Sequence, residues 1–285
     1  MIDTHLTRKF GLLYPIISDP IPGVADGELA SAISQAGALG VVGAGPCDRD
    51  WIRKQFKNAG EISVACGLYS LRLEGEPEML DYVLSFHPRA IYLSNGDPRP
   101  HAERIRDHPC RLICEARSIA DFDNILEAGA DVLVIKEGSR DGADVSEPVF
   151  SQVPKASDYL HKHNDDIVLV ASGGVTDARG LAAMIALGAD GVCLGQFFFQ
   201  PKGFQHADGP VSPTHETPAV KALRIRTLLQ TINVRAERIM SHLPRKIVKE
   251  PPGPGATGEL GQGFILDHRS LPLQKADTES DRSED

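Results

Sequence analysis

The sequence has no Cys-x-x-Cys pair, and its odd number of five cysteines fits no disulfide framework. We therefore expect reduced thiols, which are the usual state of cysteine in the cytoplasm. The N-terminal residues contain no continuous apolar signal core, and no apolar segment reaches the length that a membrane-spanning helix needs. These absences predict a soluble, cytoplasmic protein without disulfide bonds.

An excess of positive charge is also missing. The chain has 30 lysines and arginines against 39 aspartates and glutamates, which gives a formal net charge of −9 at pH 7. This balance argues against a nucleic-acid surface and against binding to an anionic membrane. The ten histidines show no spacing typical of metal ligands, so we expect no metal site. The partner that these observations favour is a small molecule.

Short apolar runs alternate with segments of helical apolar spacing, among them residues 28–35, 119–127 and 179–187. Alternation of strand and helix is typical of a parallel sheet, and eight closely spaced strands favour a closed barrel over an open sheet. The sequence therefore predicts an α/β fold of the (β/α)8 or TIM barrel type. The predicted strands are Tyr14–Ile17, Leu39–Val42, Ile62–Cys66, Ala90–Leu93, Arg111–Cys114, Val132–Ile135, Ile167–Ala171 and Gly191–Leu194.

The pattern changes after the eighth predicted strand. Residues 1–200 are expected to form the barrel, and residues 201–245 a loop and one or two C-terminal helices packed on it. Residues 246–285 are rich first in proline and glycine and then in acidic residues, so we expect a disordered tail there.

Two glycine-bearing strand ends carry the clearest chemical signal. Ser172, Gly173 and Gly174 follow the seventh predicted strand, and Asp177 is placed to cap the next helix. Gly195 follows the eighth strand one β/α unit later. Glycines let the main chain approach an anion closely, and barrels commonly bind phosphate between these two loops. The sequence predicts a phosphate-bearing ligand at this place.

Three segments together resemble the nitronate monooxygenase family, formerly called 2-nitropropane dioxygenases. They are LLYPIISDPIPGVADGELASAISQAGALGVVGAG, RLICEARSIADFDNILEAGADVLVIKEGSRDGAD and ASGGVTDARGLAAMIALGADGVCLGQFF, and the resemblance runs from about Gly11 to Phe199. It implies an FMN-dependent flavoprotein, an oxidoreductase that oxidises a small organic substrate with oxygen as acceptor. In such an enzyme the protein supplies binding, orientation and electrostatics to the cofactor.

The resemblance also implies a set of FMN contacts by position. Two follow the first strand, beside the flavin ring, and others lie in the loop after the sixth strand. The rest meet the phosphate after the seventh and eighth strands. The implied contacts are Pro20, Ile21, Glu137, Gly142, Gly173, Gly174, Cys193, Leu194, Gly195 and Gln196.

The sequence departs from the family on the substrate side. Where the family has Gly-Gly-His after the sixth strand, this chain has Ala143 and Asp144 in the last two places, and the family histidine is thought to be the catalytic base. Asp144 is a candidate replacement, because partial burial can raise the pKa of a carboxyl group; it could equally be a solvated loop residue. Asn95, after the fourth strand, is a candidate substrate ligand or a turn residue.

Two alternative functions share the same scaffold. An NAD(P)H-dependent flavin reductase needs no protein base, and a non-catalytic barrel could bind FMN or another phosphorylated ligand without turnover. A phosphosugar isomerase or aldolase would need a well-placed base or a Schiff-base lysine, and Lys136 is the only lysine at a strand end. Lys136 and Glu137 are consecutive in an extended segment, so only one of them can point into the barrel.

Overall fold

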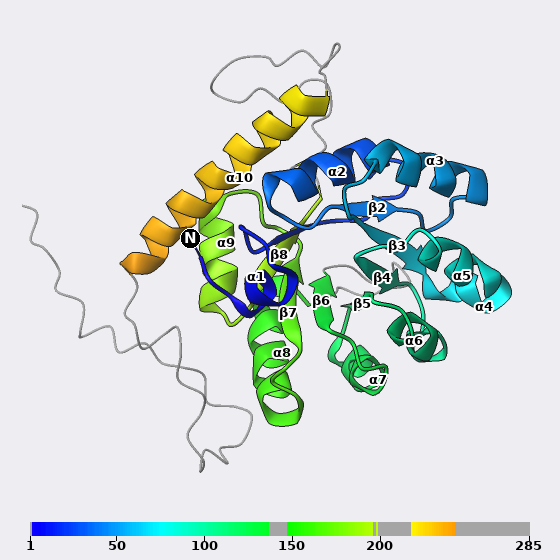
Figure 1. Cartoon of the computed structure of the whole chain (residues 1–285). Coiled ribbons are helices and arrows are strands. Elements are labelled where there is room, and N and C mark those ends of the chain that lie inside the picture. The colour runs from blue at the N-terminus through cyan, green and yellow to red at the C-terminus, as the bar shows by residue number, and fades with distance from the viewer. Residues whose placement is uncertain (1, 137–146, 196–197, 199–217, 243–285) are drawn as a thin grey trace, which may run out of the picture. The chain divides into compact units, whose positions relative to one another are not determined.

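In the computed structural model, residues 2–136, 147–195, 198 and 218–242 are described. They belong to a unit formed by Met1–Lys249. Eight parallel strands form one sheet in the order β1-β8-β7-β6-β5-β4-β3-β2 (Figure 1). A parallel bridge between Ile17 and Leu39 closes the sheet into a (β/α)8 barrel. The strands are β1 (Ile16–Ser18), β2 (Val41–Gly43), β3 (Ala65–Tyr69), β4 (Ala90–Ser94), β5 (Arg111–Ala116), β6 (Val132–Lys136), β7 (Val168–Ser172) and β8 (Gly191–Leu194).

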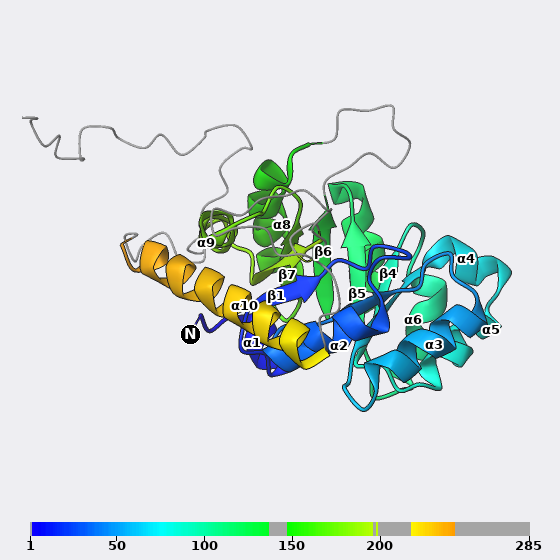
Figure 2. The same ribbon diagram turned by 90° about the horizontal axis from the view of Figure 1, so that it is seen from above.

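Helices surround the strands (Figure 2). The helix that follows β8 packs against the helices that follow β1 and β7, which is where the eighth helix of a closed barrel belongs. Among the described residues, no helix is both long and apolar enough to cross a membrane. The helices are α1 (His5–Phe10), α2 (Gly27–Ala36), α3 (Arg49–Ala59), α4 (Ser70–Gly75), α5 (Glu78–Leu84), α6 (Arg99–Arg106), a 3-10 turn η1 (Ile119–Asp121), α7 (Phe122–Glu127), α8 (Val149–His163), α9 (Ala178–Ala186) and α10 (Pro218–Ser241).

Alternation along the strands produces two buried layers. One set of side chains, including Tyr92, Ile113 and Val170, fills the inside of the barrel. Leu6 and Phe10 of α1 belong to the same cluster, so α1 closes the end of the barrel at which the strands begin. The alternate side chains pack outward against the helices. In the described part of the barrel the interior is therefore a packed core, and the end where the strands finish is left for a site.

The strand predictions agree with the structure except at their boundaries. The third strand was predicted at residues 62–66 but runs from Ala65 to Tyr69. The apolar residues Ile62 and Val64 precede it because they pack in a separate small cluster beneath α3. The predicted strand ends at Cys66, but in the structure Cys66 is the second residue of β3 and lies inside the strand. In the described part of the C-terminal region, Pro218–Ser241 form the helix α10.

Candidate functional site

The ends of β7 and its loop form an open backbone cradle. Gly173 and Gly174 have φ angles of +130° and +64°, a region that side-chain-bearing residues rarely adopt. A Cβ atom added to Gly174 would meet nothing within 4 Å, so space is open there. Outside the regular elements, no hydrogen bond from the amide of Gly173 or Gly174 is found among the described residues. Such amides suit an anion, and the cradle fits the predicted phosphate.

The cap of α9 lies beside this cradle. The side chain of Asp177 accepts hydrogen bonds from the amides of Arg179 (2.9 Å) and Gly180 (3.1 Å). Arg179 also pairs with this carboxylate, and its hydrogen bond lowers the pKa of Asp177 below the ordinary value. Asp177 occupies these two amides at the start of the helix. An anion would therefore bind the main-chain amides of the glycines in the preceding loop.

The loop after β1 crosses the barrel mouth. Asp19 donates its amide hydrogen to the carbonyl of Leu194 at 2.9 Å, which ties this loop to the end of β8. A Cβ atom on Gly67 of β3 would lie 2.4 Å from the Cβ of Pro20, and one on Gly43 of β2 would lie 2.5 Å from the carbonyl oxygen of Ile21. Glycine at both strand positions therefore makes room for the Pro20–Ile21 segment.

At the described end of β8, the two last strand residues point away from the mouth. Cys193 points into the barrel core, and burial raises the pKa of its thiol well above the ordinary value. Leu194 points outward into the helix-facing core. A Cβ atom on Gly195 would lie 3.1 Å from the Asp19 carboxylate and 3.2 Å from the Ile21 side chain. Among the described residues, the side of the mouth at β7, β8, β1 and β2 is thus formed mainly by glycine and main chain, and we call it the glycine half.

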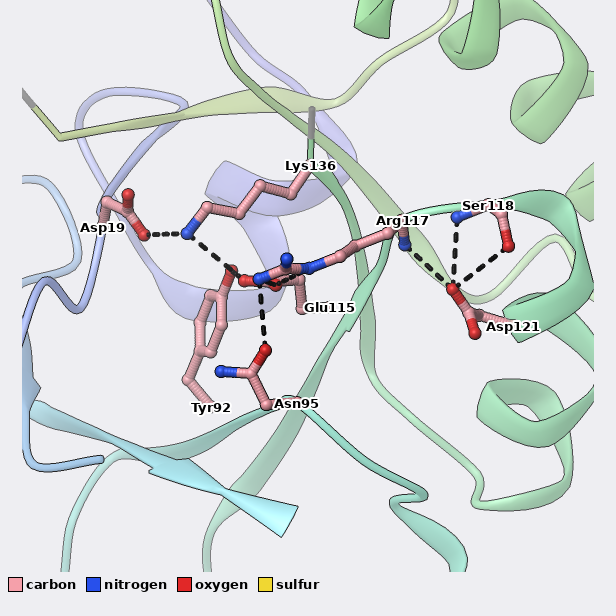
Figure 3. A network of polar contacts seen from close by, with 8 residues as sticks. All are labelled: Asp19, Tyr92, Asn95, Glu115, Arg117, Ser118, Asp121 and Lys136. Atoms are coloured by element: carbon pink, nitrogen blue, oxygen red, sulfur yellow. Dashed lines mark hydrogen bonds and ion pairs between the residues drawn. The ribbon is translucent and has the colours of Figure 1, made fainter. Parts of the chain in front are cut away.

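The β5 and β6 side of the mouth carries a network of charged side chains (Figure 3). The ammonium group of Lys136 lies 2.9 Å from the Asp19 carboxylate and 3.3 Å from that of Glu115. Glu115 also accepts hydrogen bonds from Arg117 Nε and from the hydroxyl of Tyr92, each at 3.1 Å. The network joins strands β1, β4, β5 and β6 across the end of the barrel.

Within this network the cations are more exposed than the anions. The side chains of Lys136 and Arg117 are 27% and 25% exposed, whereas those of Asp19 and Glu115 are 13% and 2% exposed. Burial by itself lowers the pKa of Lys136, but Glu115 and Asp19 outweigh it and raise the pKa above its ordinary value. Burial, together with Glu115, also raises the pKa of Tyr92. The two cations thus lie nearer the solvent than the carboxylates with which they pair.

This electrostatic arrangement bears on the aldolase alternative. A Schiff-base lysine must be neutral to attack a carbonyl carbon, which requires a lowered pKa. Lys136 has a raised pKa because two carboxylates contact it. The described site therefore does not favour Schiff-base chemistry at Lys136.

The other predicted site residues fall into two groups. Asn95 follows β4 in a left-handed turn conformation (φ +52°), and its side-chain oxygen accepts a hydrogen bond from Arg117 at 3.2 Å, so it borders the charged network. Lys136 is the member of the Lys136–Glu137 pair that faces the network. Four predicted residues lie outside the described part of the chain, namely Glu137, Gly142, Asp144 and Gln196.

Asp19, Glu115 and Arg117 were not predicted as site residues. The fifth predicted strand ends at Cys114, one residue before Glu115, whereas β5 continues to Ala116. Glu115 lies two residues beyond the inward-facing Ile113 and therefore on the same face of β5, so a predicted strand one or two residues longer places it in the mouth. A buried carboxylate also needs a cation, and that requirement points to Lys136 on the adjacent strand.

Fold and site together define a β/α barrel with an open anion cradle after β7 and β8 and a charged half opposite. The family model described as nitronate monooxygenase matches residues 3–66 and 65–241. The chain belongs to this family of flavin-dependent enzymes and is an oxidoreductase. The family resemblance inferred from the sequence is thereby confirmed.

Individual relatives are distant. A probable nitronate monooxygenase of Bacillus subtilis is 25% identical, and the match covers 79% of this chain and 75% of the relative. A nitronate monooxygenase of Neurospora crassa is 27% identical, with 64% of this chain and 59% of the relative covered. The solved structure of FabK from Thermotoga maritima has a TM-score of 0.62 at 22% identity, with 75% of this chain and 66% of that chain covered. At this identity the structural likeness supports the fold alone.

Proposed function

We propose that the protein binds FMN and oxidises a small organic anion, such as a nitronate, with oxygen as the electron acceptor. The observation that carries the proposal is the division of the barrel mouth. In the described part of the chain, the glycine half offers a backbone cradle with positive φ angles at Gly173 and Gly174 and open space at Gly174, and the opposite half carries the cations of Lys136 and Arg117. A phosphate-bearing cofactor and an anionic substrate fit these halves respectively.

Each half has a distinct role in this proposal. Gly173, Gly174 and the main chain at Gly195 would hold the FMN phosphate, and the Pro20–Ile21 segment would support the flavin ring. When bound, FMN accepts electrons from the substrate and passes them on. Lys136 and Arg117 would orient the substrate by its negative charge, and Glu115 keeps both cations in place through its ion pairs.

The test is FMN affinity in two matched glycine variants. Gly174 and Gly60 have similar φ angles of +64° and +66°, and a Cβ atom on either would meet nothing within 4 Å. Alanine is strained at both positions, because side-chain-bearing residues rarely adopt a positive φ of this size. Only Gly174→Ala also places a methyl group in the proposed phosphate cradle, since Gly60 follows α3 at the other end of the barrel.

We expect Gly174→Ala to weaken FMN binding about tenfold or more, measured by quenching of flavin fluorescence. Gly60→Ala should also lose thermal stability but keep the wild-type affinity for FMN. A wild-type protein that binds no FMN contradicts the proposal, as does equal FMN affinity in the two variants.

A flavin reductase is the second candidate, because the sequence has Asp144 where the family has its histidine, and hydride delivery from NAD(P)H to a flavin needs no protein base. Anaerobic mixing separates the two. Bleaching of the flavin by ethyl nitronate but not by NAD(P)H supports nitronate oxidation, and the reverse result supports the reductase.

A further inference from the structure

Tyr69 is the last residue of β3, at the mouth of the barrel. Alternation along β3 places it on the same side of the strand as Ala65, which lies in the interior cluster, and as Gly67, against which Pro20 packs. Cys66 and Leu68 point outward into the helix-facing core. The Tyr69 ring therefore rises on the inner side of the mouth, two residues beyond the contact with Pro20.

The ring is held in place by the loop after β2. A Cβ atom on Gly45 would lie 2.5 Å from the ring carbon of Tyr69 that bears the hydroxyl, so the glycine allows the main chain to pack directly on the ring. Arg72 donates a hydrogen bond to the carbonyl of Gly45 at 3.1 Å and fixes that loop. Tyr69 is thus positioned by its surroundings before any ligand binds.

The hydroxyl of Tyr69, by contrast, is available. No hydrogen bond to it is found within the described part of the chain, and the side chain is only partly buried. The neighbouring Tyr92 is fully buried and donates its hydroxyl hydrogen to Glu115. Burial raises the pKa of Tyr69, with Lys136 opposing and Glu115 reinforcing the effect, so its hydroxyl remains a hydrogen-bond donor at neutral pH.

We propose that Tyr69 is a catalytic residue whose hydroxyl donates a hydrogen bond to an oxygen atom of the substrate, beside the positive charges of Lys136 and Arg117. The proposal deepens the proposed function and rests on it for the identity of the reaction. Tyr69 supplies the donor, the two cations supply the charge, and the glycine half opposite remains for the cofactor. A donor and a cation acting on one oxyanion are stronger together than a neutral hydrogen bond alone.

The test compares Tyr69→Phe with Tyr82→Phe. Phenylalanine keeps the ring that packs on Gly45 and removes only the hydroxyl. Tyr82 is a matched control, because its hydroxyl donates to the carbonyl of Arg49 between α5 and α3, on the outside of the barrel. The measurements are FMN affinity, kcat and KM with ethyl nitronate, and calorimetric binding of butyrate, an unreactive oxyanion, to the protein with and without FMN.

We expect Tyr69→Phe to lower kcat/KM and to weaken butyrate binding, each about tenfold, with FMN affinity and melting temperature unchanged. Tyr82→Phe should match the wild type in every measurement. If Tyr69→Phe keeps the kcat/KM and the butyrate affinity of the wild type, the proposed role of Tyr69 is overturned. The proposed function still stands in that case, provided that the protein binds FMN and turns over the nitronate. A wild-type protein that binds butyrate but not FMN overturns the proposed function. If Tyr69→Phe then loses the butyrate binding, the hydrogen bond from Tyr69 to the oxyanion is still supported. A wild-type protein that binds no butyrate overturns the proposed hydrogen bond from Tyr69 to an oxyanion.

Discussion

Replacing Lys136 by methionine tests whether the charged network is a tightly coupled part of the fold. The change keeps the length of the side chain and removes its positive charge. Lys136 contacts the carboxylates of Asp19 at 2.9 Å and Glu115 at 3.3 Å, and both carboxylates are largely buried. Removing one partner of a buried ion pair costs about 3–5 kcal/mol because a charge is left uncompensated. Glu115 retains Arg117, so we expect the lower end of this range, about 3 kcal/mol.

The assay is urea unfolding followed by circular dichroism, with Lys155→Met as the matched control. Lys155 lies 2.6 Å from the Glu147 carboxylate, but the two side chains are 53% and 36% exposed, so the same substitution should cost less than about 1 kcal/mol. In a Glu115→Gln background, Lys136→Met should cost less than it does in the wild type, because one of the two carboxylates is already neutral. Equal losses in Lys136→Met and Lys155→Met would refute the reasoning.

Three further predictions follow from burial, charge and capping. Burial raises the pKa of all five thiols, but Cys66, Cys114 and Cys193 are fully buried, whereas Cys47 and Cys110 are partly exposed. Brief iodoacetamide treatment of the native protein should therefore label Cys47 and Cys110 first, and equal labelling of all five in peptide mass spectra would contradict this. The raised pKa of Lys136 predicts that borohydride and pyruvate trap no adduct on this residue at mildly alkaline pH; a modified Lys136 peptide would revive the aldolase alternative. Asp177→Ala should cost about 1 kcal/mol through loss of the α9 cap. The pKa of Asp177 is lower in the folded protein than its ordinary value of 3.8. The charge-dependent part of the cap's stabilisation is therefore complete above pH 3.8 and is lost as the pH falls through the folded pKa. The difference in melting temperature between the wild type and Asp177→Ala should accordingly shrink in acid.

The barrel could be predicted because its signals are local. Each strand is a short apolar run, and the helical segments between them have their own apolar spacing. All eight predicted strands are present, and the glycines after β7 lie where the sequence placed them, in conformations that favour glycine. Strand ends were less accurate, because residues such as Glu115 and Lys136 continue the strand although they are charged, and their charges are compensated across strands.

The sequence by itself determined the β/α barrel, the family and the glycine positions of the anion cradle, because periodicity, motif and glycine content are properties of neighbouring residues. Only the tertiary structure decided that Asp19, Glu115 and Lys136, from three different strand ends, meet in one network, and that Tyr69 stands on the inner side of the mouth. These placements depend on the register of the closed barrel and on the exact end of each strand. A shift of one residue in a strand's register turns each of its side chains to the opposite face. The spacing of apolar residues does not determine that register to one residue at the strand ends.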